Sequence, residues 1–480
     1  MGQFIQVVAE NGVDDVARLP QRREGSGTSP GVFDRLADFV LRRPADVFPE
    51  AVLMRARYLL LDTLGVAIAA APMEAGRIAR DAAPMLYGTD DARYRARMLF
   101  DGRQASLAGA AFAVATQIDN LDGHDGYSPT KGHIGVAVVP ALAALAEQRP
   151  DLGGRDALAA LAVGYEVAGR AGIALHASVS DYHTSGAWNA LGVVALAARL
   201  RRLSDDHLRQ ALGIAEYHGP RSQMMREIAN PTMLHDGSGM GALVGLSAAV
   251  LAELGFAGAP AITIEDPAIA GHWTDLGAFW QSLHQYVKPY PICRWAHAAI
   301  DGVRAIRMQH GLSAADVEGV EVNSFHYAAT LFPDMPDTTS KAQYSLRFAV
   351  ATFLIHGRIG LEHISGEGLR DPAVAELLKR ISVTEDARHS ERFPAGRWAD
   401  VTVTTRDGRR LTSGDIHARG GPEAPLAEAE IEAKFMELSS PVLGEGRSAA
   451  IAAAVLALVE PASRFSDLSA LLYDAPAGAA

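Results

Sequence analysis

The chain has 480 residues, of which 49% are hydrophobic and 21% are charged. This length exceeds what one simple core holds and predicts two domains, with a third left open. The net charge of -12 is spread along the chain and not gathered in blocks, which argues against nucleic-acid binding. A single cysteine, Cys293, excludes an internal disulfide and fits a reducing compartment, so we expect a cytoplasmic protein.

The first half of the chain is predicted to be helical. Residues 1–30 are polar and lack the apolar core of an export signal, so we expect a flexible leader there. Apolar runs of helical length then follow one another, and many are apolar on most faces, which indicates burial among other helices and no membrane partner. The predicted helices cover residues 51–72, 104–118, 134–148, 155–175, 186–202, 205–217 and 238–254. No strand pattern occurs before about residue 260, so we predict an all-helical domain over residues 31–275.

The pattern changes after Pro260. A helix is expected over residues 295–310. Strands are expected over Val317–Phe325, Ile381–Thr384 and Ala399–Thr405, the last with period-two alternation and followed by the hairpin signal Asp407-Gly408. Residues 276–423 are therefore predicted to form a smaller α+β domain, and residues 424–475 to return as helices to the first domain. The fold class is mainly α: a large all-helical domain with a smaller α+β domain.

The segment Asp119–His133 is the strongest candidate for chemistry. It combines Asp119, Asp122, His124 and Lys131 with His133, while its glycines and Pro129 interrupt any regular period. A polar loop held between two buried helices can position acid–base groups rigidly. A solvated surface loop with incidental charges is the alternative reading.

Other kinds of site have weaker signals. The acid spacing in this loop does not match a calcium loop, and no HExxH motif or Cys pair occurs, so we expect no metal and no cofactor. The run Gly237–Gly241 follows no strand and favours close helix packing over a phosphate loop. Cys293 has Lys288 and Arg294 nearby, which could lower its thiol pKa, although a lone Cys is more often a small core residue.

Two isolated histidines stand in polar turns. His183 and His235 each precede an apolar helical run. Alone, each is more often a capping or satisfied interior residue than a catalyst. Their repetition indicates that several helices point their ends at one pocket.

Seven segments, in the same order along the chain, carry a resemblance to a known family. They are Tyr58-Leu-Leu-Leu-Asp-Thr-Leu-Gly65, the Asp119–His133 loop, Gly164-Tyr-Glu166, Tyr182-His-Thr-Ser185, Leu234-His-Asp-Gly237, Lys288-Pro-Tyr-Pro291 and Tyr344-Ser-Leu-Arg-Phe348. Over roughly residues 33 to 460 the chain resembles the MmgE/PrpD family of dehydratases, decarboxylases and epimerases. The resemblance implies a helical domain, a smaller lid domain, a cleft between them and a homodimer that needs no organic cofactor.

The resemblance also implies roles for particular residues. Positions matching the family's catalytic groups are Asp119, His133, His183 and Lys288. Candidate substrate-binding residues are Asp122, His124, Lys131, Arg221, Arg226, His235, Cys293, His297 and Tyr344. Three positions depart from the decarboxylases: Thr232 replaces a Lys, Phe348 a Tyr and Cys293 a His.

The leading hypothesis is a cofactor-independent lyase, dehydratase- or decarboxylase-like, that acts on a small carboxylate. A base would remove a proton alpha to a carboxylate, and cations would stabilise the resulting enolate-like charge. His183 or Asp119 is the expected base, with Lys288 and an Arg as the carboxylate clamp. The alternatives are an epimerase or isomerase of a small dicarboxylate, or a degenerate family member that only binds a ligand.

Overall fold

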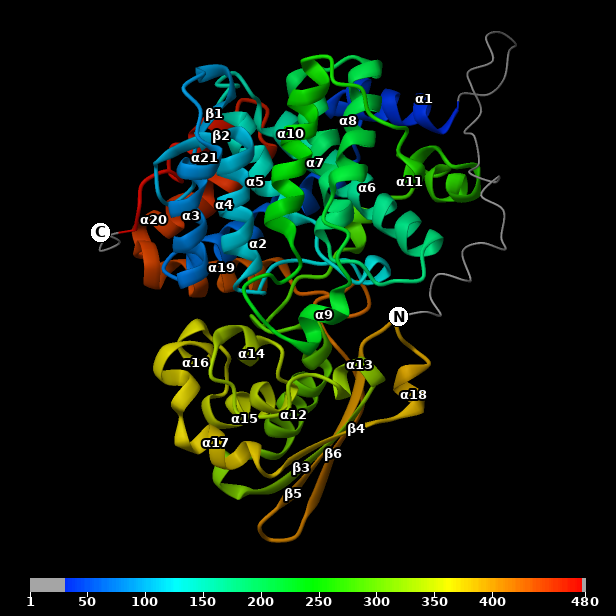
Figure 1. The fold of residues 1–480 in the computed structure, drawn as a ribbon. Coiled ribbons are helices and arrows are strands. Elements are labelled where there is room, and N and C mark those ends of the chain that lie inside the picture. The colour runs from blue at the N-terminus through cyan, green and yellow to red at the C-terminus, as the bar shows by residue number, and fades with distance from the viewer. Residues whose placement is uncertain (1–30, 477–480) are drawn as a thin grey trace, which may run out of the picture.

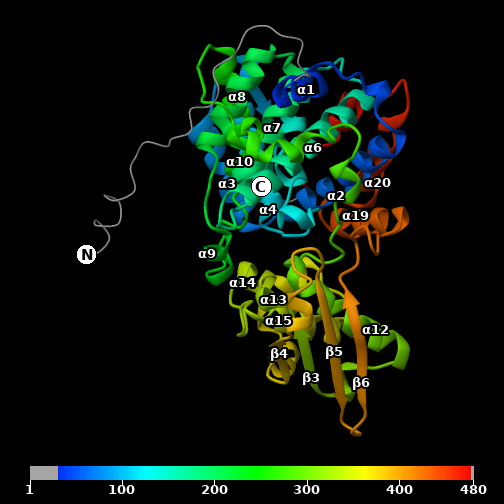
Figure 2. The same ribbon diagram turned by 90° about the vertical axis from the view of Figure 1, so that its right-hand side faces the viewer.

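The computed structural model describes residues 31–476, so the expected leader over residues 1–30 lies outside the described residues. Figures 1 and 2 show a large helical part stacked on a smaller part that contains a four-stranded sheet. The two parts are called the helical part and the small part below.

The helical part is built from closely packed helices of small residues. Its main members are α2 (Glu50–Ala70), α3 (Glu74–Tyr87), α4 (Leu107–Asp119), α5 (Gly135–Ala146), α6 (Gly154–Ser178), α7 (Gly186–Arg201), α8 (Asp205–His218) and α10 (Ser238–Glu253), with the short α1 (Val32–Ala37), α9 (Met224–Ala229) and α11 (Ile262–Glu265) at its periphery. Helices α6 and α7 cross where Gly192 faces Gly164, since a Cβ on Gly192 would come 2.5 Å from the Gly164 carbonyl oxygen. The helices expected from the sequence are confirmed to within a few residues, and α3 is additional.

One prediction for this part was wrong. A short antiparallel pair, β1 (Arg95–Arg97) with β2 (Gln104–Ser106), precedes α4, although no strand was expected before residue 260. The helix predicted from residue 104 begins at Leu107, because the Ser106 side chain accepts a hydrogen bond from Gly109 N and caps it.

Helix α6 is long and apolar enough to cross a membrane by length and composition. However, 94% of its most apolar window is buried inside the protein, between α5, α7 and α2. This is the environment of a core helix.

The small part contains a mixed sheet in the order β4-β3-β5-β6. Its strands are β3 (Val317–Ser324), β4 (Ile381–Glu385), β5 (Trp398–Thr405) and β6 (Arg410–His417). Its helices are α12 (His297–His310), α13 (His326–Ala329), α14 (Thr339–Gln343), α15 (Leu346–His356), α16 (Leu361–Ile364), α17 (Pro372–Leu378) and α18 (Ala387–Ser390). Strands β3 and β4 are parallel, and the other pairs are antiparallel. The predicted strands and the turn at Asp407-Gly408 are confirmed.

The alternation of buried and half-buried residues along β5 shows which face of this sheet is covered. Ala399, Val401 and Val403 are buried while the residues between them are half-buried, and α12 packs on β5 and β6. One face of the sheet therefore holds the core of the small part.

After the sheet the chain returns to the helical part. Helix α19 (Glu428–Leu443) packs on α2, and α20 (Glu445–Leu456) contacts both, followed by the short α21 (Phe465–Ser469) (Figure 1). On α19, Lys434 forms a 2.5 Å ion pair with the buried Asp62 of α2 and donates to the Gly123 carbonyl at 2.7 Å. Helix α19 thus holds the Asp119–His133 loop in place through its contact with Gly123.

Candidate active site

Three helix N-termini converge on the Asp119–His133 loop, and each receives a carboxylate. Asp125 lies 3.4 Å from Gly135 N at the start of α5. Asp236 accepts from Ser185 N at 3.2 Å, just before α7. Asp119 accepts from Ser238 N at 3.0 Å, at the start of α10. Helix N-termini carry partial positive charge, and here the side chains of Asp125, Asp236 and Asp119 occupy them, so the starts of α5, α7 and α10 meet at this loop.

Lys288 is the central cation of the site. It is 0% exposed, pairs with the Asp122 carboxylate and donates to the Asp122 carbonyl oxygen at 2.9 Å. Burial opposes its charged form, but the Asp122 carboxylate together with Tyr286 and Cys293 outweighs burial and raises the pKa of Lys288. An ammonium has three N–H donors, so one remains for a ligand.

The His133 ring is held in one orientation. Its Nδ1 lies 2.7 Å from the Asp125 carbonyl oxygen, which requires a proton on Nδ1 and leaves the Nε2 lone pair free. Nε2 lies 3.8 Å from the Asp236 carboxylate. Burial, and next the charge of Lys288, lowers the pKa of His133 to about 3, so the ring is neutral and able to accept a proton.

Asp119 and Asp236 form a pair of buried carboxyl groups. Burial raises the pKa of both, and the charge of Asp236 raises that of Asp119 further, well above its ordinary value. The Ser185 hydroxyl donates to Asp236 at 2.5 Å and accepts from His133 N at 2.9 Å. Raised pKa values keep protonated carboxyl groups available as proton donors.

Two further imidazoles line this cluster. The His124 ring lies 4.5 Å from the His133 ring, and its Nε2 is 3.9 Å from Asp119. The His235 ring lies 5.6 Å from the Tyr344 ring of the small part, with the two ring planes tilted at 45°. Burial lowers the pKa of His235 to about 4 and that of His124 well below its ordinary value. Both are therefore neutral.

The donor atoms of Asp122, His124 and His133 lie within 4.8 Å of one another, as metal ligands would. The ammonium of Lys288 already neutralises Asp122. The Lys288 ammonium therefore supplies positive charge where a metal ion would. Activity after treatment with a chelator tests the expectation that no metal is needed.

Backbone strain is concentrated at the site. Five described residues other than glycine have a positive φ, and three of them are site candidates: Asp122 at 53°, Lys131 at 55° and His235 at 47°. Such conformations cost about 1–3 kcal/mol each and cluster at functional sites.

The thiol of Cys293 is not activated. It is buried beside Asp122 and Lys288, and burial, followed by the charge of Asp122, raises its pKa to about 12. The hypothesis that nearby cations lower this pKa was wrong, because burial disfavours the thiolate more than Lys288 favours it.

His183 is the most exposed of the four predicted catalytic residues, at 9%. The α7 helix begins at Gly186 as predicted, and the His183 backbone N donates to His176 Nε2 at 3.3 Å. Its ring Nδ1 is buried and has no hydrogen-bond partner among the described residues. A catalytic role for His183 stays a prediction.

Several predicted binding residues lie elsewhere. Arg221 and Arg226 are exposed, and Arg221 is 3.9 Å from Glu216, so neither joins the inner cluster. His297 is 2.9 Å from the Ile292 carbonyl oxygen and packs against Tyr290 within the small part. Thr232 is exposed and bonded to Glu227, and Phe348 is a fully buried residue of α15.

Five residues around this cluster were not predicted as site residues, although Arg294 was named as a neighbour of Cys293, and Ser185 and Asp236 stand within motifs of the family resemblance. They are Ser185, Asp236, Tyr286, Arg294 and Arg397. Two had a signal: Asp236 follows the predicted His235, and Tyr286 stands two residues before Lys288 on an extended segment, whose backbone pairs with Gly126. Arg397 precedes β5 without any motif, and only the fold buries it.

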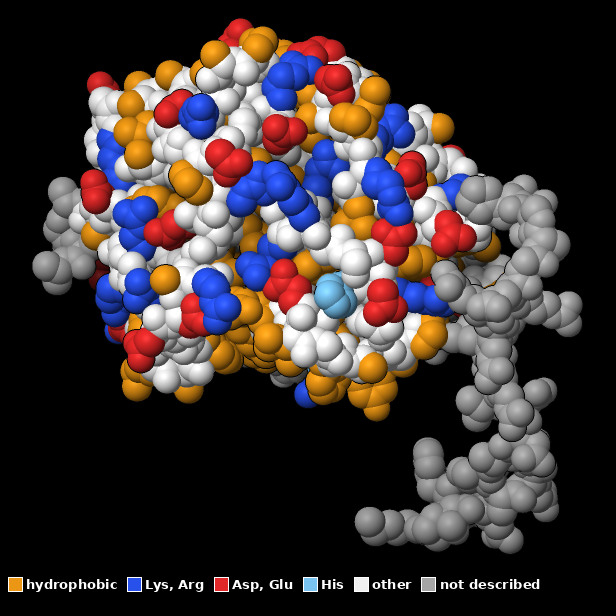
Figure 3. Space-filling view, turned by 90° about the horizontal axis from the view of Figure 1, so that it is seen from above, with side chains coloured by type: hydrophobic (Ala, Val, Ile, Leu, Met, Phe, Trp, Pro, Cys, Tyr) orange, Lys and Arg blue, Asp and Glu red, His pale blue; other side chains and the backbone are white. Residues whose placement is uncertain are grey.

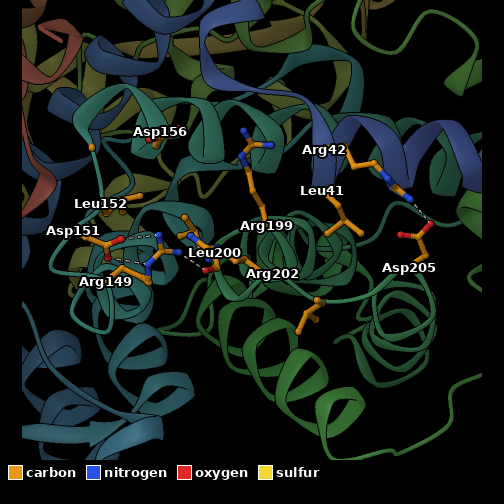
Figure 4. A pocket seen from close by; sticks show the side chains of 12 residues that line it. Leu41, Arg42, Arg149, Asp151, Leu152, Asp156, Arg199, Leu200, Arg202 and Asp205 are labelled. Carbon is orange, nitrogen blue, oxygen red and sulfur yellow. Dashed lines mark hydrogen bonds and ion pairs between the residues drawn. The ribbon is translucent and has the colours of Figure 1, made fainter.

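A separate hollow of about 640 Å³ lies at the opposite end of α7, where Arg199, Arg202, Asp151 and Asp205 line it (Figure 4). Its charges pair internally, as in the 2.5 Å contact between Arg42 and Asp205. Basic and acidic side chains are interspersed over the face of the helical part seen from above (Figure 3). No predicted site residue lines this hollow, so we place the candidate site at the buried cluster.

The Asp125 carboxyl group gives a pH-dependent test. Burial, and next the charge of Asp62, raises its pKa to about 7. Because the pKa of Asp125 is higher in the folded state, its contribution to the free energy of unfolding is greatest below about pH 4, the pKa of an Asp in the unfolded chain. This contribution falls as the pH rises to about 7. Asp125→Asn cannot ionise, so its unfolding free energy relative to wild type should increase from pH 4 to 7 and then level off. Denaturant titrations at several pH values measure this difference, and parallel curves would contradict it.

Comparisons with known proteins identify the family of the chain. The model of the MmgE/PrpD N-terminal domain matches residues 34–267, and that of the MmgE/PrpD C-terminal domain matches residues 290–459. The chain is 26% identical to a mouse cis-aconitate decarboxylase, covering 70% of this chain and 72% of the relative. It is 24% identical to the human cis-aconitate decarboxylase (82% and 85%) and 23% identical to the Aspergillus terreus cis-aconitate decarboxylase (95% and 98%). The chain is therefore an enzyme of the MmgE/PrpD family.

Proposed function

We propose that the chain is a cofactor-independent lyase of a small carboxylic acid that either removes a proton alpha to a carboxylate and expels water, or expels carbon dioxide and protonates the carbon left behind. The observation that carries this proposal is the buried set of neutral imidazoles, raised-pKa carboxyl groups and one ammonium at three helix N-termini. The cis-aconitate decarboxylases to which the chain is similar support a substrate of this class.

In a dehydration, His133 Nε2 is the proposed base. It takes the alpha proton, and the electron pair moves onto the substrate carboxylate, where the Lys288 ammonium stabilises the charge. A protonated carboxyl group, Asp119 or Asp236, gives its proton to the departing hydroxyl, which leaves as water. The base ends protonated and the carboxyl group ionised, and solvent restores both.

In a decarboxylation, the bond to the carboxylate breaks first. Its electron pair remains on the substrate carbon, carbon dioxide leaves, and the same protonated carboxyl group supplies a proton to that carbon. Both reactions use one acid–base set, and the pose of the substrate decides between them.

The test is turnover of citrate-, aconitate- and succinate-type acids by purified, chelator-treated protein in deuterium oxide. We expect product formation without added metal, and deuterium in the recovered substrate or product. A strict need for metal would contradict the cofactor-free reaction. Deuterated, epimerised substrate without loss of water or carbon dioxide would instead identify an epimerase. Acids that raise the melting temperature without any turnover would identify a binding protein.

We also propose that the small part acts as a lid. Lys288 lies on the segment that leads into the small part, and Tyr344 lies within the small part. Both are buried, Lys288 against Asp122 and Tyr344 against His235 of the helical part. Substrate can enter only if these surfaces separate. Small-angle scattering should give a smaller radius of gyration with bound tricarballylate than without it, and equal radii would contradict the lid.

A further inference from the structure

A cavity of about 330 Å³ lies between the helical part and the small part, apart from the catalytic cluster. Helix α19 and Ala69 of α2 form one wall, and residues between 358 and 365, which follow α15 and include part of α16, form the other. Figure 1 shows α16 below α19 at this junction. None of the four predicted catalytic residues lines the cavity, so it is a separate space in the molecule.

The lining of this cavity is mostly apolar. Leu438 and Val442 line it from α19, and Ile359 and Leu361 line it from the small part. Apolar cavities stay dry and bind apolar molecules. Ligand sites often lie where two domains meet, and a volume of about 330 Å³ is within their usual range. The cavity therefore has the size, the position and the lining of a site for a small apolar molecule.

The four charged side chains that line the cavity already pair with opposite charges. Arg358 pairs with Glu362 and, at 2.6 Å, with Glu437 of α19. Lys434 pairs with Asp62 at 2.5 Å. An ionised ligand would have to break one of these pairs or lie beside a charge of its own sign, and an unpaired buried charge is costly. The lining therefore favours an uncharged ligand.

Lys434 gives the cavity a hydrogen-bond donor. Of its three N–H groups, one donates to Asp62 and a second donates to the Gly123 carbonyl oxygen at 2.7 Å. The third is available to an oxygen atom of a ligand. Gly123 also lines the cavity and stands between Asp122 and His124 in the chain, so a molecule bound here contacts the back of the catalytic loop.

We propose that this cavity binds an uncharged aliphatic molecule with one hydroxyl or carbonyl oxygen. Its chain packs against Leu361, Leu438 and Val442, and its oxygen accepts a hydrogen bond from Lys434. This inference goes beyond the proposed function and does not depend on it, because no acid–base residue takes part. The two walls belong to different parts of the molecule, so a ligand that contacts both favours the arrangement in which the parts are together. The ligand thus acts on the separation of the two parts and not on the reaction itself.

The test is a calorimetric titration of the purified protein with 1-butanol, 1-pentanol and 1-hexanol, and with hexanoate and hexylammonium. Each buried CH2 group should increase the affinity by about threefold to fourfold, so 1-hexanol should bind about tenfold more tightly than 1-butanol, at one site per chain. Hexanoate and hexylammonium should each bind at least about tenfold more weakly than 1-hexanol. The absence of saturable binding of 1-hexanol, or an equal affinity for either ion, would overturn the proposal.

Two variants fill the cavity from opposite walls. Val442→Phe on α19 and Leu361→Trp on α16 add volume at half-buried positions that line it. Each should weaken the binding of 1-hexanol by about tenfold or more, the loss of two or more buried CH2 groups. Leu443→Phe is the matched control: Leu443 is the next residue on α19 and is also half-buried, but it does not line the cavity. Its replacement should leave the affinity unchanged.

Wild-type affinity for 1-hexanol in both filling variants would contradict the site. If neither variant folds, crystals of the wild-type protein soaked with 6-bromo-1-hexanol decide. Bromine density beside Leu361 and Val442 would support the site, and bromine density elsewhere, or none, would overturn it.

Discussion

Replacing His133 with Asn should lower kcat by about a hundredfold to ten-thousandfold, the usual contribution of a general acid or base. Asn keeps an N–H that can donate to the Asp125 carbonyl oxygen, as Nδ1 does at 2.7 Å, but it has no basic nitrogen. The fold should therefore be retained while the proton acceptor is lost. Steady-state kinetics and a thermal melt of the same preparation measure both effects.

His183→Gln, prepared in parallel, ranks the two imidazoles. If His183 is the base, its replacement should lower kcat by about a hundredfold or more with little change in stability. If it only supports the start of α7, about 1 kcal/mol of stability should be lost while activity remains. Near-normal turnover of His133→Asn would remove His133 from the proposed mechanism.

Replacing Lys434 with Met should lower the free energy of unfolding by about 3–5 kcal/mol, because it leaves the carboxylate of Asp62 buried without its cation. Asp62 is 1% exposed and Lys434 is its only ion-pair partner among the described residues. Burial already raises the pKa of Asp62, so the loss should shrink at low pH, where the carboxyl group is protonated. Chemical denaturation at two pH values measures it.

The exposed pair between Lys379 and Glu376, at 3.0 Å, supplies the control. Lys379→Met should cost less than about 1 kcal/mol, as exposed ion pairs do. Adding Asp62→Leu to Lys434→Met should recover much of the lost stability, since no buried charge remains. A loss for Lys434→Met no larger than that for Lys379→Met would show that the buried pair does not stabilise the fold.

The helices of the fold could be predicted because their apolar runs are long and end at clear signals. Ser204 is one such signal: its side chain caps α8 at His207 N, 3.1 Å away. The β1–β2 pair was missed because strands of three residues are too short to show alternation. Predictions for β3 and β5 succeeded because one face of each is buried and the other is not.

The site was predictable where its residues follow one another in sequence. Asp119, His133 and Asp122 stand in one loop, so their proximity required no knowledge of the fold. Arg397 is buried only through the folding of the small part, and no local sequence pattern indicates this burial. Arg221 and Arg226 were expected at the site because of their charge alone, and charge does not show where a side chain points in the fold.

The contact between Lys434 and Asp62 joins residues 372 positions apart. During synthesis, at about 5–20 residues per second, α2 emerges tens of seconds before α19. Until then the surface of α2 that α19 covers stays open, and Asp62 has no cation. The nascent chain cannot close its largest core before the whole small part has been made, so native contacts of high sequence separation form last. Such a chain is expected to fold slowly and to depend on chaperones that protect exposed apolar helices.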